Sequence, residues 1–191
     1  MAGDWLAANR GDVAAEKILD AAEDLFARHG AASVGMNDIA KASGCSRATL
    51  YRYFENRDAL YTAYVHREAH RVFRELGETL SGTADPGAQL VEGIIAALRQ
   101  VRESPALSSW FAPTQRPIGG EMAERSEVIK ALTEAYLRAL GVDDVEKRAR
   151  WMVRVIVSLL VFPGRDESDE RAMLEDFVLP MVLPPLSDPT R

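Results

Sequence analysis

The stretch from Met36 to Leu60 constrains the fold more than any other part of the 191-residue chain. It contains two short helical patterns, separated by the residues Ser43, Gly44 and Cys45, and glycine can adopt the positive φ of a tight turn. Four apolar positions on the two sides of this turn can hold the helices at a fixed angle: Ile39, Ala40, Leu50 and Phe54. The stretch therefore predicts a helix-turn-helix.

The second helix of the pair, predicted over residues 47–54, has a polar face that packing does not require. Ser46 precedes it as a suitable N-cap. An exposed helix of this kind fits the major groove of DNA, where residues near its N-terminus reach the base edges. Tyr51 and Tyr53 could instead be core aromatics, but Leu50 and Phe54 alternate with them and are better core candidates.

The charge distribution agrees with this interpretation, although the net charge of −6 by itself disfavours nucleic-acid binding. Within residues 36–57, Asp38 and Glu55 are the only acids. They are outnumbered by basic residues, namely Lys41, Arg47, Arg52 and Arg57. Positive charge is thus concentrated at the predicted helix-turn-helix.

The rest of the chain also shows helical periodicity, and no segment alternates convincingly with period two. Caps, glycines and prolines predict about nine helices. We expect them at residues 13–29, 36–42, 47–54, 57–80, 86–101, 104–111, 121–140, 144–162 and 167–179. Pro180 should kink or end the last helix. We therefore predict an all-α fold.

Several sequence signatures point to one family. The segment ILDAAEDLFARHG precedes MNDIAKASGCSRATLYRYFENRDAL, which contains Ser46-x-x-Thr49-Leu50-Tyr51-x-x-Phe54 and then Arg57-x-Ala59-Leu60. Over residues 17–61 the chain resembles the tetracycline-repressor (TetR) family of bacterial regulators. Beyond these residues, the resemblance covers only the succession of helices and the overall length.

This resemblance implies a division of the chain and a function. We expect a flexible tail over residues 1–11, a three-helix helix-turn-helix DNA-binding domain over 12–58, and a helical ligand-binding and dimerisation domain over 59–191. The implied function is a sequence-specific transcriptional regulator, by family default a repressor, that a small molecule releases from a palindromic operator. The expected partners are double-stranded DNA, a small-molecule effector and a second copy of the chain.

The resemblance also assigns roles to residues of the DNA-binding domain. Arg47 and Ala48 occupy positions that read bases, since arginine binds guanine and a methyl group contacts thymine. The remaining DNA-contact candidates are expected to bind phosphates or adjacent bases: Asn37, Ser46, Thr49, Tyr51, Arg52, Tyr53 and Arg57. Asn37 departs from the arginine that is frequent in the family, and Gly35 from its serine or threonine helix cap.

The dimer interface is predicted from the segment WMVRVIVSLLVF and the last helix. Trp151–Phe162 is apolar nearly all round, which indicates burial both against its own domain and against a partner. The interface candidates are Trp151, Val155, Leu159, Phe162, Leu174, Phe177 and Met181. The alternative is that residues 151–162 form only a central core helix.

The ligand site is less visible in the sequence. Candidates are Ile94, Leu98, Trp110, Phe111, Tyr136 and Arg154, although the apolar ones could equally be core residues. A charged Arg154 within an apolar run predicts a buried group, which needs an acidic partner or an anionic ligand.

Other functional classes remain as alternatives. His66 and His70 lie four residues apart, a spacing that can bind a metal in a metal-responsive regulator, but no third ligand is obvious. There is no glycine-rich phosphate loop, HExxH motif or credible Ser/His/Asp set, so we expect neither an enzyme nor a cofactor. A helical adaptor without a DNA partner would not need the basic face. The single cysteine, Cys45, the absence of a signal-peptide pattern and the absence of a membrane-length apolar run favour a cytoplasmic protein.

Overall fold

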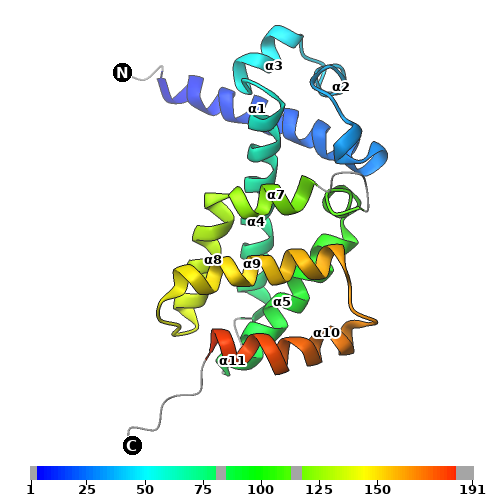
Figure 1. The fold of residues 1–191 in the computed structure, drawn as a ribbon. Helices are drawn as coiled ribbons and strands as arrows, with labels where there is room; N and C mark the ends of the chain where they lie inside the picture. The colour runs from blue at the N-terminus through cyan, green and yellow to red at the C-terminus, as the bar shows by residue number, and fades with distance from the viewer. Residues whose placement is uncertain (1–3, 81–84, 113–117, 184–191) are drawn as a thin grey trace, which may run out of the picture.

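The computed structural model describes residues 4–80, 85–112 and 118–183, with side chains from Asp12 onward. These residues form helices and connecting loops without strands, so the all-α prediction is confirmed (Figure 1). A smaller N-terminal unit lies at one end, and α4 (Arg57–Leu80) runs from it into the larger helical part.

The N-terminal unit consists of α1 (Asp4–His29), a 3-10 turn (Ala31–Ser33), α2 (Met36–Ala42) and α3 (Arg47–Tyr53). The expected helix start at Val13 is wrong, because α1 already begins at Asp4. The expected flexible tail over residues 1–11 stays a prediction, and residues 1–3 lie outside the described residues. Because LAAN and VAAEK are good helix formers, they outweigh the cost of about 1 kcal/mol that Gly11 imposes on a helix interior. Asp12 therefore lies within α1 and does not cap it.

The core of this unit follows the predicted helix-turn-helix anchors. Ile39 and Leu50 are fully buried between α2 and α3, and Phe26 of α1 is also fully buried. The Phe26 ring meets the rings of Tyr61 and Tyr64 edge-on, at centroid distances of 5.1 and 5.0 Å. Because both tyrosines belong to α4, this packing attaches the unit to the long helix.

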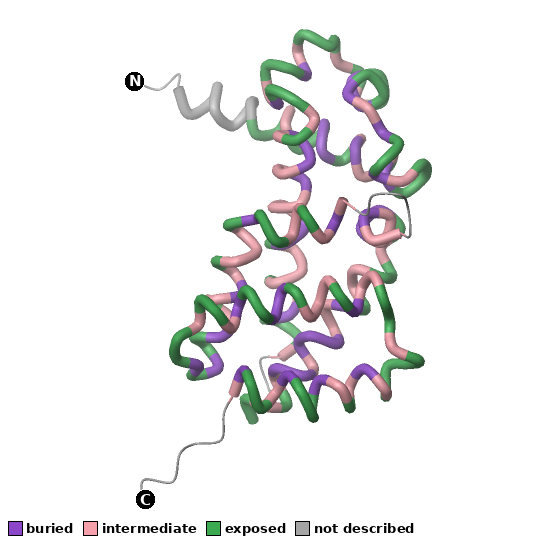
Figure 2. The backbone as a smooth tube through the Cα atoms, viewed as in Figure 1, coloured by how far each residue is buried: buried purple, intermediate pink, exposed green. Residues whose placement is uncertain are grey.

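The larger part contains the remaining helices. These are α5 (Pro86–Glu103), α6 (Pro105–Ser108), α7 (Ile118–Arg125), α8 (Glu127–Ala139), α9 (Val145–Val161), α10 (Glu167–Met173) and α11 (Leu179–Val182). Of these helices, α5, α7 and α8 pack against α4. Its buried core is built mainly from α5, α8, α9 and the C-terminal helices. Figure 2 shows exposed residues along α9 and the C-terminal helices, between buried ones. None of the helices in the described ranges is long and apolar enough to cross a membrane.

Two further regions of the chain differ from the predicted helices. The expected helix over residues 121–140 begins earlier, at Ile118, and is divided at Ser126, whose hydroxyl accepts the Ile129 N–H at 3.1 Å and starts α8. At the C-terminus, a π-helical turn over Leu174–Val178 precedes Pro180, and α11 continues to Val182. Proline has no N–H to donate and its ring crowds the carbonyl four residues earlier, so a wider turn lets the chain remain helical.

Candidate nucleic-acid interface and internal cavity

Helix α3 has one buried face and one exposed face. Leu50 is fully buried and Phe54 nearly so, whereas Arg47, Ala48 and Arg52 are exposed. Ser46 forms the N-cap: its Oγ accepts the Thr49 N–H at 3.0 Å and lies 2.9 Å from the Thr49 hydroxyl. Ser46 and Thr49 therefore shape the start of α3, and the exposed side chains project from a capped helix.

Arg47 joins the two helices of the helix-turn-helix at their surface. Its Nη1 donates to Asn37 Oδ1 at 2.9 Å, and its Nη2 lies 3.4 Å from the Tyr51 hydroxyl. The guanidinium also lies over the Tyr51 ring, 5.3 Å from its centroid. Three predicted DNA contacts thus form one exposed cluster, in which Asn37 orients Arg47.

Two other predicted contacts are placed differently. Tyr53 is half-buried and packs against the core, while the Arg52 guanidinium lies over its ring at 5.4 Å. Arg57 is turned inward: its Nη2 donates to the carbonyls of Ala31 and Ala32 at 3.1 and 2.9 Å. In this structure Arg57 therefore holds the 3-10 turn, which the sequence did not indicate.

Tyr61 of α4 also supports this turn, through its hydroxyl group. Its hydroxyl lies 2.7 Å from the Ala31 carbonyl and 2.8 Å from the Val34 carbonyl. Burial raises the pKa of Tyr61, so the hydroxyl keeps the proton that it donates. The loop that leads into α2 is consequently attached to α4.

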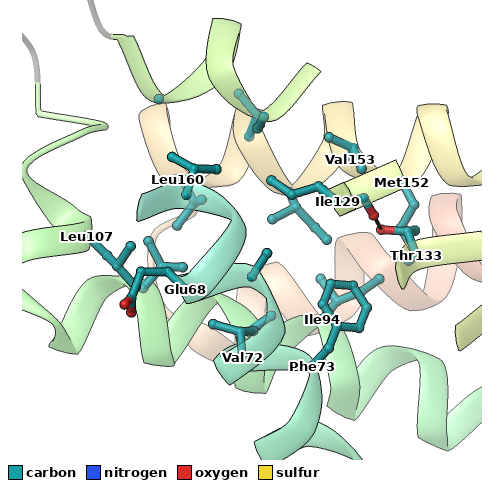
Figure 3. A pocket seen from close by; sticks show the side chains of 18 of the residues that line it. Glu68, Val72, Phe73, Ile94, Leu107, Ile129, Thr133, Met152, Val153 and Leu160 are labelled. Carbon is teal, nitrogen blue, oxygen red and sulfur yellow. Dashed lines mark hydrogen bonds between the residues drawn. The ribbon is translucent and has the colours of Figure 1, made fainter. Parts of the chain in front are cut away.

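The larger part contains a cavity of about 150 Å³, partly open to solvent, between α4, α5, α7, α8 and α9 (Figure 3). Of the predicted ligand-site residues, Ile94, Trp110, Phe111 and Tyr136 line it. Leu98 does not, because it is buried in the adjoining core. The expectation that Arg154 is buried is wrong: its side chain is 59% exposed, and its Nε donates to Glu124 Oε1 at 3.1 Å. Because α9 turns this position outward, the charge stays in water.

Sequence reasoning missed most of the cavity wall. The missed residues on α4 are Val65, Glu68, Ala69, Val72, Phe73 and Leu76. Others on α8 and α9 include Ile129, Thr133 and Val153. The spacing of the α4 residues by three and four does mark one helix face. However, the same spacing is expected for a closed core, so it does not reveal that a cavity lies against it.

Glu68 is the charged residue among those that line the cavity. Its side chain is 3% exposed, and its Oε1 accepts from Arg67 Nε at 3.1 Å. Burial, with the nearby Glu23 carboxylate, raises the pKa of Glu68 against the opposing effect of Arg71 and Arg67. Arg67 also contacts Glu16, Asp20 and Glu23 of α1, so the cavity wall and the N-terminal unit share one ion-pair cluster.

The predicted interface residues fall into two groups. Trp151, Phe162, Phe177 and Met181 are exposed large apolar side chains, and Val155 is half-buried. Leu159 and Leu174 are instead buried in the core of the larger part, where a partner surface would not reach them. The exposed group lies on α9 and the C-terminal helices; Figure 1 shows α9 crossing the middle of the larger part, and α10 and α11 at the end far from α3.

The two histidines of α4 form no larger cluster. No group of three or more histidine, cysteine or acidic residues in the described ranges is placed to hold a metal ion. Partial burial and the neighbouring His70 lower the pKa of His66. The pair therefore offers two ligands at most.

Comparison with known proteins identifies the family. Residues 18–64 match the family described as bacterial regulatory proteins, tetR family. An uncharacterized HTH-type transcriptional regulator of Mycobacterium tuberculosis (strain ATCC 25618 / H37Rv) is 59% identical over 188 residues, covering 96% of this chain and 93% of that protein. The chain belongs to the TetR family.

Two solved structures have the same fold. RolR in complex with resorcinol superimposes with a TM-score of 0.69 at 16% identity, covering 95% of this chain and 98% of that one. Thermus thermophilus FadR in complex with lauroyl-CoA gives a TM-score of 0.64 at 20% identity, covering 93% and 98%. In this TetR-family protein, α2 and α3 are accordingly the helix-turn-helix.

Proposed function

We propose that this TetR-family regulator is a homodimeric repressor that binds a palindromic operator through α3 and is released when a small, largely apolar molecule enters the cavity. One observation carries the proposal: α4 belongs to both sites. Its Tyr61 supports the loop before α2, and its Val72 and Leu76 line the cavity. A change in the cavity wall therefore has a direct structural route to α3.

The DNA side of the proposal rests on the exposed cluster of Asn37, Arg47 and Tyr51. Arginine recognises guanine through two parallel hydrogen bonds, and Arg47 is already oriented by its contacts to Asn37 and Tyr51. Ala48 presents a methyl group beside it on the exposed surface. Arg52 adds a positive charge one turn further along, where a phosphate would approach.

The dimer side rests on the exposed apolar residues of α9 and the C-terminal helices. Large apolar side chains such as Phe162 and Phe177, 76% and 68% exposed, are costly to leave in water when they gather in one region. A second copy of the chain would cover them and place two α3 helices on one DNA duplex. Half-sites about one helical turn apart, roughly 34–36 Å, would then match the two-fold symmetry of the dimer.

The release step rests on the cavity and on the ion pairs by which Arg67 connects the cavity residue Glu68 to Glu23 of α1. A ligand that fits better when α4 is displaced would change the spacing of the two α3 helices. Operator affinity then falls only by as much as the ligand prefers the released state. The fold neighbours RolR and FadR were solved with resorcinol and lauroyl-CoA, which supports a small-molecule role for this larger domain without identifying the molecule.

The first test is selection of bound duplexes from a random pool at near-physiological salt. The protein should recover a palindrome, and the Arg47→Ala/Tyr51→Ala double variant should not. Arg165→Ala is a matched control, because it removes the same charge from a fully exposed site near α10, far from α3. If the unaltered protein recovers no palindrome, or if the double variant selects the same one, the α3 assignment is wrong.

A further inference from the structure

The surface that faces the cavity is almost entirely carbon. Figure 3 shows the side chains of Val72, Ile94 and Val153 around it, and these come from α4, α5 and α9. Within the described residues, the polar side chains of the wall are those of Glu68, Trp110, Thr133 and Tyr136. The chemistry that a ligand can meet in the cavity therefore depends on where the polar atoms of these four residues lie.

The two hydroxyl groups of the wall are bonded to backbone carbonyls. The Thr133 hydroxyl donates to the Ile129 carbonyl at 2.7 Å, and the Tyr136 hydroxyl donates to the Gln89 carbonyl at 2.7 Å. The Tyr136 hydroxyl lies directly against α5 because residue 93 is glycine: a Cβ atom at Gly93 would overlap that oxygen. Burial raises the pKa of Tyr136 to about 12, so its hydroxyl keeps the proton that it donates. Both hydroxyl protons are thus used within the protein.

The other two polar side chains keep their polar atoms away from the cavity. Both carboxylate oxygens of Glu68 meet arginines: Oε1 accepts from Arg67 Nε at 3.1 Å, and Oε2 forms an ion pair with Arg71. Glu68 Oε2 and Trp110 Nε1 have almost no accessible surface. Glu68 and Trp110 therefore contribute mainly carbon atoms to the wall.

We propose that the effector is a hydrocarbon about the size of one benzene ring, with neither a hydrogen-bond donor nor an acceptor. This inference rests on the proposed function, in which the cavity is the effector site. The size follows from the volume, since an apolar cavity of about 150 Å³ binds benzene. The chemical class follows from the wall, which offers a ligand carbon and almost no polar surface.

The same wall disfavours polar molecules of equal size. A hydroxyl or amine group that leaves water for this cavity loses its hydrogen bonds to water and gains none in return. A carboxylate would also lie near the negative charge of Glu68. An ammonium group would find that carboxylate already paired with Arg67 and Arg71. A hydrocarbon has no hydrogen bonds to lose, and its transfer out of water is favourable.

A hydrocarbon can act on the protein only by filling space. It binds most tightly to the conformation whose cavity fits it best, and it shifts the protein towards that conformation. Because Val72 and Leu76 place α4 in the cavity wall, a change in the width of the cavity moves the helix that also holds the N-terminal unit.

The experiment is calorimetric titration of the full-length protein with benzene, phenol and benzoate, which share one ring. Phenol adds a hydroxyl group, and benzoate adds a negative charge. We expect benzene to bind at least about tenfold more tightly than phenol, because the phenol hydroxyl would be left without a partner in the cavity. Benzoate should not bind.

Variants that fill the cavity locate the binding site. Ala97→Leu adds carbon to the cavity from α5, and Ala123→Leu does so from α7. Each should weaken benzene binding at least about tenfold, because the interior then has too little free space for a ring. Ala88→Leu is the matched control: it is the same change on α5, at an exposed position outside the cavity wall, and benzene binding should remain. Circular dichroism establishes that each variant is folded.

The outcomes separate this inference from the proposed function. Equal or tighter binding of phenol, binding of benzoate, or unchanged benzene binding in both folded cavity-filling variants would overturn the ligand class. Anisotropy of the selected duplex tests release separately. If benzene binds as expected but leaves the duplex bound, the ligand class of the cavity stands and the release mechanism fails. If no probe binds while the duplex does, the ligand class fails and the DNA-binding function stands.

Discussion

The N-terminal unit and the larger helical part differ in how completely their helices pack: the first has a closed aromatic junction, and the second leaves a cavity. Phe26, Tyr61, Tyr64 and Trp110 fill the junction with ring contacts at centroid distances between 5.0 and 5.6 Å. The larger part instead leaves about 150 Å³ between its helices. In the proposed function, the part that binds DNA needs one fixed geometry and the part that admits a ligand needs space, and α4 belongs to both.

The sharpest test of this contrast compares one large truncation in each region. Phe26→Ala should lower the free energy of unfolding by about 3–5 kcal/mol, because it opens a cavity inside a closed core. Ile129→Ala removes a half-buried side chain that already borders a cavity, and it should cost less than about 2 kcal/mol. Urea denaturation measures both, and equal costs would show that the cavity wall is as tightly packed as the junction.

The second prediction concerns exposed apolar residues in the two regions. Trp151→Glu/Phe177→Glu should raise the dissociation constant of the proposed dimer at least about a hundredfold, because an interface core would leave the two carboxylates without water or a charged partner. Val13→Glu is the control: Val13 is 51% exposed, but it lies on α1. Sedimentation of the three proteins gives the dissociation constants, and a dimer that tolerates both glutamates would place the interface elsewhere.

The third prediction tests the connection between the regions. Arg67→Met should destabilise the protein by about 2 kcal/mol, because it leaves the buried Glu68 and the half-buried Glu23 without one of their partners. Arg74→Met, at an exposed position of the same helix, should change stability by less than about 0.5 kcal/mol. Matching effects in thermal unfolding would mean that the α1–α4 ion pairs contribute little to stability.

The smallest expected effect is a difference in pH dependence between two buried glutamates. Hydrogen bonds from Arg102 lower the pKa of Glu170, so its contribution to stability is present above the unfolded pKa and is lost as pH falls through the folded one. Burial raises the pKa of Glu68, so the cost of its charged form diminishes as pH falls through the raised value.

Unfolding experiments on Glu170→Gln and Glu68→Gln between pH 4 and pH 7 would detect this difference. As pH falls, the unaltered protein should lose stability relative to Glu170→Gln and gain it relative to Glu68→Gln. If the stability of the unaltered protein changes in the same direction relative to both variants as pH falls, Glu68 does not lie in an environment that disfavours its charge.

Several features of this protein could be predicted from local sequence alone. The starts of α2, α3 and α4 match the predicted ones, because a helix start depends on residues within a few positions, here Gly35, Ser46 and Asn56. The exposed face of α3 follows in the same way from the alternation of Leu50 and Phe54 with polar residues. The family could be inferred at this level as well, since its signature lies within one contiguous stretch.

Other features depended on contacts between residues far apart in the chain. Arg57 turns inward because the carbonyls of Ala31 and Ala32 lie beside it, and Arg154 stays exposed because Glu124 meets it at the surface. Glu68 became a cavity residue only when α4 packed against α5, α7 and α8. Periodicity reports which face of a helix is apolar, but whether that face meets another side chain or an open cavity depends on how the helices pack together. The helix-turn-helix was therefore determined by the sequence locally, whereas the cavity was decided only by the tertiary structure.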